Sequence, residues 1–296
     1  MPLISFSHLL LGAVAAIWGF AFVAQSAGMD HLGPYSFNAA RLLLGALSLL
    51  PLWLLMGKRR TPQGLALWLG GALAGSLMFG GITAQQVGLQ ETTAGNAGLI
   101  TGMYIVLVPM VGVLLGHSTR PQTWAGVTLA VLGLYSLSVG PDFTVNRGDL
   151  QVLIGALFWT AHVLVIGWLS RQVDAISLAV WQFVVASVLG VALAAWLETP
   201  LPGDFEAAGL PLLYAGVASS GIAFTLQIIA QRRVEASTAA LIMSMEAVFA
   251  VIGGWLLLGE SLGVREQIGC ALMLAGMLVS QWPSRNRRTA PLAAAG

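Results

Sequence analysis

The stretches TWAGVTLAVLGLYSL (Thr123–Leu137) and EQIGCALMLAGMLVS (Glu266–Ser280) repeat one pattern of small and apolar residues. In both, a glycine is followed by a leucine three residues later and by a second glycine four residues after that. A shift of 141 to 143 residues extends the match to other parts of the two halves. The further matched pairs are Trp18 with Trp159, Arg41 with Gln182, Thr83 with Thr225, and Gln85 with Gln227. The chain is therefore an internal duplication.

The composition indicates an integral membrane protein. Hydrophobic residues make up 57% of the 296 residues and charged residues only 8%, too few charges to cover the surface of a soluble domain of this length. The apolar runs are about 20 residues long, and at about 1.5 Å per residue a helix of that length crosses a hydrocarbon core of about 30 Å. We predict helices, because a helix satisfies its backbone N–H and C=O groups within the segment.

The pattern predicts an all-α integral membrane protein with ten transmembrane helices. The spans are centred at 8–27, 34–56, 64–86, 93–115, 121–139, 149–169, 175–197, 209–230, 236–258 and 264–282. Each half holds five spans, and an odd number of crossings makes the second half enter the membrane from the opposite side. The two five-helix repeats are therefore predicted to be inverted, an architecture common among secondary transporters. We place them at residues 1–140 and 146–285, followed by a cytoplasmic tail at 286–296.

The basic residues predict the orientation, since Lys and Arg near span ends are retained on the cytoplasmic side. With the N-terminus inside, only Arg147 and Arg265 fall in outer loops. The inner loops and tail hold Lys58, Arg59, Arg60, Arg120, Arg171, Arg232, Arg233, Arg285, Arg287 and Arg288. Both termini are expected in the cytoplasm. No basic region precedes the first apolar run, and no small-residue cleavage site follows it. We therefore expect this run to be a retained helix and not a signal peptide.

Two full charges lie clearly inside predicted spans, Arg41 in the second and Glu246 near the middle of the ninth. A charge at mid-bilayer costs about 2.5 to 3.5 kcal/mol on insertion scales, so such residues are functional candidates. For Arg41, a role in substrate binding and a role in holding helices together both stay open. Glu246 could bind a substrate ammonium group or carry a proton. The competing interpretation is a buried ion pair between the two.

Other polar and aromatic side chains inside the spans complete a candidate site. Tyr104 corresponds to Glu246 in the repeat alignment, so the two are expected to face each other across a central axis, where inverted-repeat carriers bind substrate. The candidate residues are Trp18, Arg41, Gln85, Asn96, Tyr104, Trp159, His162, Trp181, Gln182, Gln227 and Glu246. Structural roles compete with this assignment. A lone buried histidine is more often a core residue, and glutamines also form hydrogen bonds between membrane helices.

Several motifs resemble the EamA branch of the drug/metabolite transporter (DMT) superfamily. They are WGFAF at Trp18–Phe22, AARLLLGA at Ala39–Ala46, LLGH at 114–117 against LLGE at 257–260, and the paired GxxLxxxG of the fifth and tenth spans. Within that branch the sequence looks most like the bacterial YddG-type amino-acid exporters. It departs from the family pattern at Ala247, where many members have proline, and this leaves kinking of the ninth helix open.

This resemblance implies export of small metabolites across the bacterial inner membrane. Amino acids, including aromatic ones, are the leading substrate class, with broad selectivity and alternating access around a central cavity. The implied partners are the substrate and the lipid bilayer, with no nucleic acid, no cofactor and no metal. The working assumption for the oligomeric state is a monomer. The alternatives are export of other metabolites or drugs, and a receptor or scaffold without transport.

An enzyme and a channel are both disfavoured by the motifs. The sequence contains neither HExxH nor GxSxG and no carboxylate pair in facing spans, the constellations that intramembrane hydrolysis would need. It also contains no TVGYG run of the kind that forms a selectivity filter. We therefore expect a carrier.

Overall fold

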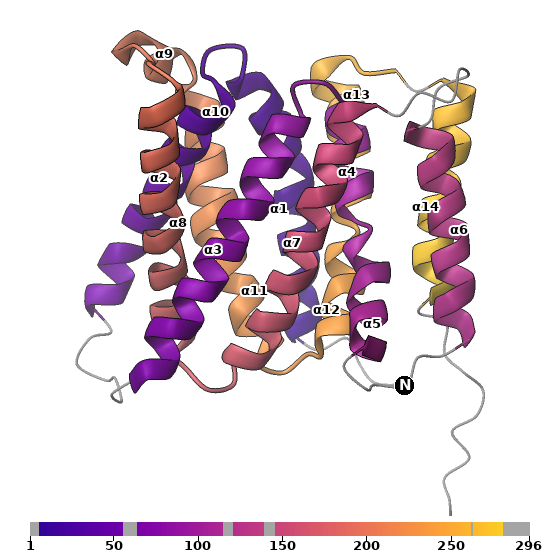
Figure 1. The fold of residues 1–296 in the computed structure, drawn as a ribbon, viewed down its shortest axis with the longest axis horizontal. Coiled ribbons are helices and arrows are strands. Elements are labelled where there is room, and N and C mark those ends of the chain that lie inside the picture. The colour runs from indigo at the N-terminus through magenta and orange to yellow at the C-terminus, as the bar shows by residue number, and fades with distance from the viewer. Residues whose placement is uncertain (1–5, 56–63, 115–120, 139–145, 262, 281–296) are drawn as a thin grey trace, which may run out of the picture.

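The computed structural model describes residues 6–55, 64–114, 121–138, 146–261 and 263–280. Within these ranges every regular element is a helix, in agreement with the predicted class. Part of the predicted orientation signal lies outside the described residues: Lys58, Arg59, Arg60, Arg120, Arg285, Arg287, Arg288 and the tail at 286–296. The bundle and its two ends are shown in Figure 1.

The first half of the chain contains α1 (Phe6–Gly28), α2 (Pro34–Leu55), α3 (Gly64–Gly88), α4 (Ala94–Thr101), α5 (Tyr104–Leu114) and α6 (Pro121–Ser138). The second half contains α7 (Arg147–Leu169), α8 (Ala175–Leu197), α9 (Pro202–Ala207), α10 (Gly209–Leu213), the π-helix η2 (Tyr214–Ala223), α11 (Phe224–Gln231), α12 (Ala236–Met243), α13 (Glu246–Leu258) and α14 (Val264–Ser280). The short helix α9 at residues 202–207 was not among the predicted elements.

Eight helical segments of the described chain are long and apolar enough to cross a membrane. Five of them are single helices, namely α1, α2, α3, α7 and α8. The other three combine consecutive elements: Ala94–Leu114, Gly209–Gln231 and Ala236–Leu258. Helices α6 and α14 stand where the fifth and tenth spans were predicted, but their apolar stretches are shorter, Trp124–Gly133 and Gln267–Gly276. Ten crossings therefore remain a prediction.

The fourth and ninth predicted spans are each interrupted near their middle. Helix α4 ends at Thr101 and α5 begins at Tyr104, while α12 ends at Met243 and α13 begins at Glu246. At both breaks the backbone N–H groups bond three residues back instead of four, for example from Ala247 to Ser244 at 3.1 Å, which tightens the helix locally. The ninth span is thus broken even though Ala247 replaces the proline of related sequences. Each break puts a candidate residue at the start of the following helix.

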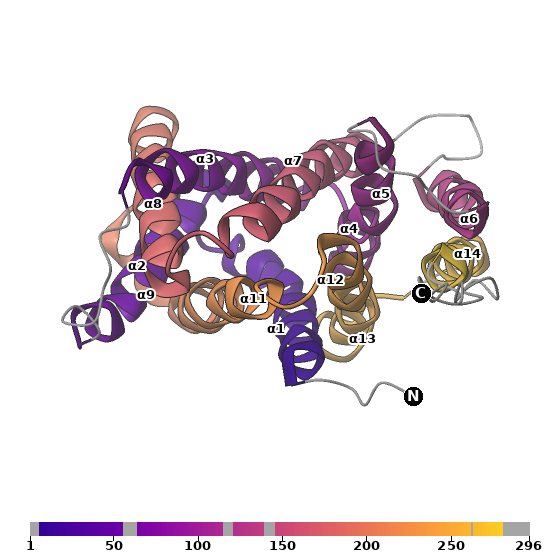
Figure 2. The same ribbon diagram turned by 90° about the horizontal axis from the view of Figure 1, so that it is seen from below.

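Helices α6 and α14 form a pair at one side of the bundle (Figures 1 and 2). Their contact is reciprocal: a Cβ atom added at Gly133 would lie 2.6 Å from the Gly269 carbonyl oxygen, and one added at Gly276 would lie 2.6 Å from the Gly126 carbonyl oxygen. Side chains would clash at Gly133 and Gly276, so these glycines allow the two backbones to approach closely. The repeated GxxLxxxG motif therefore encodes this helix pair.

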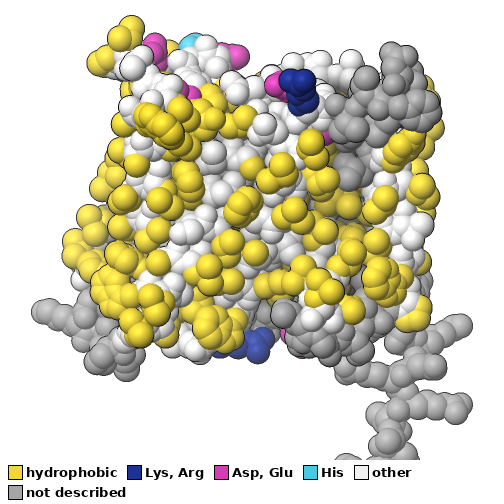
Figure 3. All heavy atoms as spheres, viewed as in Figure 1, with side chains coloured by type: hydrophobic (Ala, Val, Ile, Leu, Met, Phe, Trp, Pro, Cys, Tyr) yellow, Lys and Arg dark blue, Asp and Glu magenta, His cyan; other side chains and the backbone are white. Residues whose placement is uncertain are grey.

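Apolar side chains cover the flanks of the bundle and charges gather at its two ends (Figure 3). Large side chains such as Trp168 and Trp196 are exposed on these flanks, as expected for a surface in contact with lipid. We call the end where α1 and α3 terminate, at Gly28 and Gly88, the upper face, because it is at the top of Figure 1. The opposite end is the lower face, and it carries Arg171, Arg232 and Arg233.

Two glutamates cap the N-termini of helices at the upper face. The Glu198 carboxylate accepts hydrogen bonds from the backbone N–H groups of Tyr35 (3.1 Å) and Ser36 (2.7 Å) at the start of α2. Glu260 does the same for Ala94 (2.8 Å) and Gly95 (3.1 Å) at the start of α4. A carboxylate stabilises a helix N-terminus through its unpaired N–H groups and the helix dipole. These caps connect helices that lie far apart in the sequence.

The contact between α1 and α13 gives a test of the packing. A Cβ atom at Gly19 would clash with the Phe249 side chain and lie 2.7 Å from the Glu246 carbonyl oxygen, whereas one at Gly12, on the same helix, would meet nothing within 4 Å. Gly19→Ala is expected to destabilise the protein by about 1 to 3 kcal/mol through overpacking. Gly12→Ala is expected to be neutral or to stabilise it by up to about 1 kcal/mol. Thermal midpoints in detergent measure both, and equal midpoints would contradict the packing.

Candidate functional site

A single cavity in the middle of the bundle collects most of the candidate residues. It is lined by Trp18, Ala21, Phe22, Gln25, Arg41, Gln85, Thr101, Tyr104, Trp159, His162, Val163, Ser219, Phe224, Gln227 and Glu246. These residues come from both halves of the chain and from nine helical elements. The centres of water molecules can reach a volume of about 40 Å³, which is room for about three waters. The cavity is therefore narrow, and a larger solute requires the helices to separate.

Aromatic rings form one wall of the cavity. Phe224 lies at the centre of the group, with its ring centroid 4.6 Å from that of Trp18, 5.7 Å from Trp159 and 5.9 Å from His162. Flat, apolar surfaces of this kind bind the hydrophobic part of a ligand and leave its orientation to a few polar groups. The wall suits a large or planar side chain.

The polar groups that face the cavity are largely without partners. The buried atoms with no hydrogen-bond partner among the lining residues are Arg41 Nε and Nη1, Tyr104 Oη, His162 Nδ1, Ser219 Oγ, Gln227 Nε2 and Oε1, and Glu246 Oε1. Buried polar groups in proteins are nearly always hydrogen-bonded, and each exception needs an explanation. Here the exceptions converge on one cavity. Such a set is typical of a site that binds a polar ligand or water.

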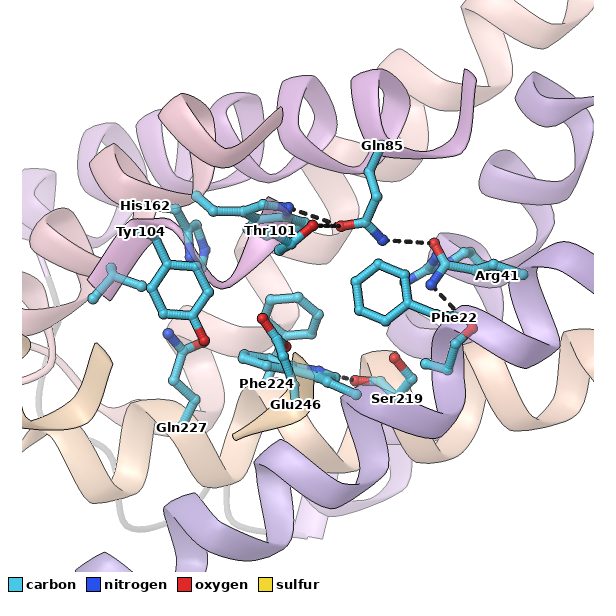
Figure 4. Close-up of a pocket in the computed structure, with 15 residues that line it drawn as sticks. Phe22, Arg41, Gln85, Thr101, Tyr104, His162, Ser219, Phe224, Gln227 and Glu246 are labelled. Carbon is cyan, nitrogen blue, oxygen red and sulfur yellow. Dashed lines mark hydrogen bonds between the residues drawn. The ribbon is translucent and has the colours of Figure 1, made fainter. Parts of the chain in front are cut away.

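The two charged residues of the cavity are not paired with each other. Arg41 and Glu246 are each only 3% exposed, and among the described residues no ion pair joins them. Figure 4 draws Arg41 and Gln85 at one end of the cavity and Tyr104 and Gln227 at the other, with Glu246 between. The predicted alternative of a buried Arg41–Glu246 ion pair is therefore wrong for this conformation. The cavity presents one cation and one carboxylate at separate places.

Toward the upper face the cavity is lined by a hydrogen-bonded group that we call the upper barrier: Gln25, Gln85, Thr101 and Trp159. Gln85 Nε2 donates to Gln25 Oε1 at 2.9 Å. Gln85 Oε1 accepts from Trp159 Nε1 at 3.1 Å and from Thr101 Oγ1 at 3.5 Å. The group joins α1, α3, α4 and α7, and Gln85 lies three residues before the end of α3 at the upper face. The Gln85 amide thus connects helices in this conformation.

The repeat counterpart of Gln85 has a different environment. Gln227 lies near the lower end of α11, four residues before Gln231, and neither atom of its amide group has a partner. The repeat counterpart of Trp159 is Trp18, whose Nε1 donates to the Ser219 carbonyl oxygen of the π-helix at 3.1 Å instead of to Gln227. Gln85 and Trp159 are therefore hydrogen-bonded to each other at one end of the cavity. Their repeat counterparts Gln227 and Trp18 are not bonded to each other at the other end.

Three predicted site residues do not line the cavity. Gln182 lies behind it, and its Oε1 accepts a hydrogen bond from His162 Nε2 at 3.0 Å. Trp181 points away, donating through Nε1 to the Trp68 carbonyl oxygen at 2.9 Å and stacking edge-on against the Trp68 ring. Asn96 is buried near the start of α4, where its backbone N–H is bonded by the Thr93 cap at 3.1 Å. Trp181, Gln182 and Asn96 thus do not line this cavity, and their place at a substrate site stays a prediction.

The sequence prediction missed several residues that the structure adds to the cavity. Gln25 and Ser219 are the polar additions, and Phe22 and Phe224 are the aromatic ones. Thr101 lies three residues before Tyr104 and Phe224 three residues before Gln227, so helical spacing contained a signal for both. For Gln25 the only signal was a polar residue in an apolar helix. Its role depends on a hydrogen bond with Gln85, which lies 60 positions away in the sequence.

A sequence model of the EamA-like transporter family matches the chain twice, at residues 5–139 and at residues 146–281. An uncharacterised transporter of Archaeoglobus fulgidus is 32% identical over 277 residues, which cover 93% of this chain and 85% of that protein. The uncharacterised inner membrane transporter YedA of Escherichia coli is 24% identical over 285 residues, covering 91% of this chain and 90% of YedA. The family pattern therefore occurs once in each half of the chain.

Among solved structures, a crystal structure of a protein superposes with a TM-score of 0.69, covering 94% of this chain and 98% of that chain. Its sequence identity is 18%. The likeness supports the fold alone.

Proposed function

The chain belongs to the EamA-like transporter family, and we propose that it is a secondary transporter that exports amino acids, including aromatic ones, like the YddG-type exporters that its sequence resembles. It is a multi-pass membrane protein, and the similar proteins of Archaeoglobus fulgidus and Escherichia coli are named as transporters. The observation that carries the proposal is the buried cavity with one unpaired cation, one unpaired carboxylate and an aromatic wall.

These groups match the chemistry of a zwitterion. Arg41 has unpartnered N–H groups at Nε and Nη1, and a guanidinium group binds carboxylates through charge-assisted hydrogen bonds. Glu246 Oε1 offers an acceptor to an ammonium group. Trp18, Trp159 and Phe224 provide the apolar surface for the side chain. A pocket with one charge of each sign favours a ligand that is neutral overall, since an unpaired buried charge is costly.

The proposed mechanism is alternating access by two inverted five-helix repeats, with α6 and α14 as the fifth and tenth spans. Three observations support it: the two family matches, the reciprocal glycine contacts of α6 and α14, and the matched breaks before Tyr104 and Glu246. Interrupted helices at mid-membrane are common where inverted-repeat carriers bind substrate. Rocking of one half against the other would widen the narrow cavity enough for an amino acid.

We propose that the upper face is the external side of the bacterial inner membrane and that both termini are cytoplasmic. Of the described basic residues outside the helix interiors, Arg171, Arg232 and Arg233 lie at the lower face and Arg147 and Arg265 at the upper face. The excess is at the lower face, and an excess of Lys and Arg marks the cytoplasmic side. The bonded upper barrier then closes the external path, whereas Gln227 near the cytoplasmic end is free. The structure would correspond to a state closed toward the outside.

Counterflow in proteoliposomes tests the proposal. Vesicles loaded with unlabelled phenylalanine are expected to take up labelled phenylalanine transiently, since a carrier exchanges substrate whereas an enzyme or scaffold does not. Gln227→Ala and Tyr104→Ala are expected to lower the exchange rate several-fold, about 1 kcal/mol for each lost hydrogen bond, without loss of expressed protein. Absence of counterflow by the unaltered chain would reject amino-acid export. Competition by planar drugs but not by amino acids would favour the alternative substrate class.

A further inference from the structure

We propose that Glu246 is a proton-exchange group, so that one proton enters the cell for each zwitterionic substrate that leaves. This inference rests on the proposed transport function and deepens it by naming the coupling ion. The carboxyl group would hold a proton while the cavity is without substrate and release it when a substrate ammonium group arrives.

The position of Glu246 carries the first step. The side chain is 3% exposed, opens α13 at the break in the ninth span and faces the central cavity. Its Oε1 has no hydrogen-bond partner. An ionised carboxylate buried without a partner is costly, and binding a proton removes most of that cost.

The groups around Glu246 provide the second observation. A fixed cation beside Glu246 would stabilise its ionised carboxylate, and the carboxyl group would then not need to bind a proton. The titratable and charged groups that face the cavity with it are Tyr104 from α5, His162 from α7 and Arg41 from α2. Arg41 forms no ion pair with Glu246 in the described structure, and His162 contacts Gln182 through Nε2. The lining residues of α1, α3, α4, η2 and α11 carry no charge. Glu246 is therefore the one carboxylic acid among the lining residues, and its deprotonated form carries the negative charge that an ammonium group needs.

The exchange balances in atoms and charge. On the cytoplasmic side, the Glu246 carboxyl group releases its proton to water, and the carboxylate accepts a charge-assisted hydrogen bond from the substrate ammonium group. The substrate carboxylate binds Arg41 at the same time. On the external side the substrate leaves and a proton from external water returns to Glu246. No covalent bond to carbon or nitrogen forms or breaks, and the only transferred species is the proton.

This scheme makes transport electrogenic. The loaded cavity has no net charge, because Arg41 and the ionised Glu246 bind a zwitterion of matching charges. The unloaded cavity returns with Arg41 charged and Glu246 protonated, so one positive charge moves inward for each substrate exported. Export is then driven by both the pH gradient and the membrane potential, the latter worth about 2.3 kcal/mol per 100 mV for one charge.

The test uses the full chain in liposomes with the membrane potential held at zero and an acidic lumen. Labelled phenylalanine is expected to accumulate inside about tenfold for one unit of pH difference, because one proton leaves for each molecule that enters. Glu246→Gln is expected to lose this accumulation. Because it also loses the partner of the substrate ammonium group, it is expected to exchange phenylalanine more slowly at equal pH. Glu206→Gln, a change at an exposed residue of α9, is the matched control and is expected to keep both the accumulation and the exchange rate.

A pH-sensitive dye in the lumen gives a second readout that needs no variant. Addition of external phenylalanine to the unaltered protein is expected to make an acidic lumen more alkaline. Counterflow without this alkalinisation, or full accumulation by Glu246→Gln, would overturn the proton-exchange role while leaving transport intact. Absence of counterflow by the unaltered protein would instead reject the proposed function together with the role of Glu246.

Discussion

Replacement of Arg41 by glutamine is expected to weaken phenylalanine exchange about 10- to 100-fold, chiefly through a higher KM. Hydrogen bonds to charged groups contribute about 1.5 to 3 kcal/mol each, and Arg41 Nε and Nη1 are free to bind a carboxylate. Arg41→Lys is expected to restore part of the loss, because lysine keeps the positive charge but not the planar set of guanidinium donors. Counterflow at varied substrate concentration measures the effect. Arg171→Gln, at the exposed lower face, is the control.

The same variant decides between the two roles that the sequence left open for Arg41. If Arg41 binds substrate, the substrate-free protein contains an unpaired buried charge, and Arg41→Gln should leave the thermal midpoint unchanged or raise it. If Arg41 holds helices together, the variant should unfold at a lower temperature. A lower midpoint with an unchanged KM would reject its assignment to the substrate site.

Gln85→Leu is expected to open the upper barrier. The change leaves Gln25 Oε1, Thr101 Oγ1 and Trp159 Nε1 without their Gln85 partner. Loss of two or three such bonds removes about 2 kcal/mol from the closed state, which shifts the population about 30-fold toward the open one. The measured quantity is the rate at which a cysteine in the cavity reacts with a membrane-impermeant maleimide added outside intact cells.

The probe is Ala21→Cys, at a residue that lines the cavity, in a Cys270→Ser background that removes the natural cysteine. Gln85→Leu is expected to speed labelling about tenfold or more. Gln227→Leu is the matched control, since Gln227 occupies the equivalent repeat position but has no bonds to lose. Equal labelling rates in the two variants would show that Gln85 does not close the cavity.

The membrane class, the helical composition and the duplication could be predicted from the sequence. Length and hydropathy of a span are local properties, because each apolar run must match the thickness of the hydrocarbon core whatever its neighbours are. The glycines at 126, 133, 269 and 276 similarly predict close helix packing, and the structure pairs them across α6 and α14. Eight of the eleven candidate site residues line one cavity, because polar groups in apolar helices avoid lipid and turn inward.

The breaks in the fourth and ninth spans were not predicted at their positions. Proline favours a bend in a helix, and the fourth span contains Pro109 within α5, yet the interruption lies at Gly102 and Met103, before Tyr104. The ninth span breaks without a proline at Ala247. In both cases backbone hydrogen bonds change from four to three residues back. Hydropathy does not register this change, because the side chains stay apolar.

The sequence by itself thus determined which apolar runs form helices, that the two halves share one pattern and which charges lie within apolar helices, since these depend on runs and spacings along the chain. Only the tertiary structure decided how each polar group is used. Gln85 and Gln227 occupy equivalent positions, but one is bonded to Gln25 and Trp159 and the other is free. Trp181 turns toward Trp68 and away from the cavity. The reason is that a hydrogen bond needs two groups from distant segments at the right distance, and the packing of whole helices sets that distance.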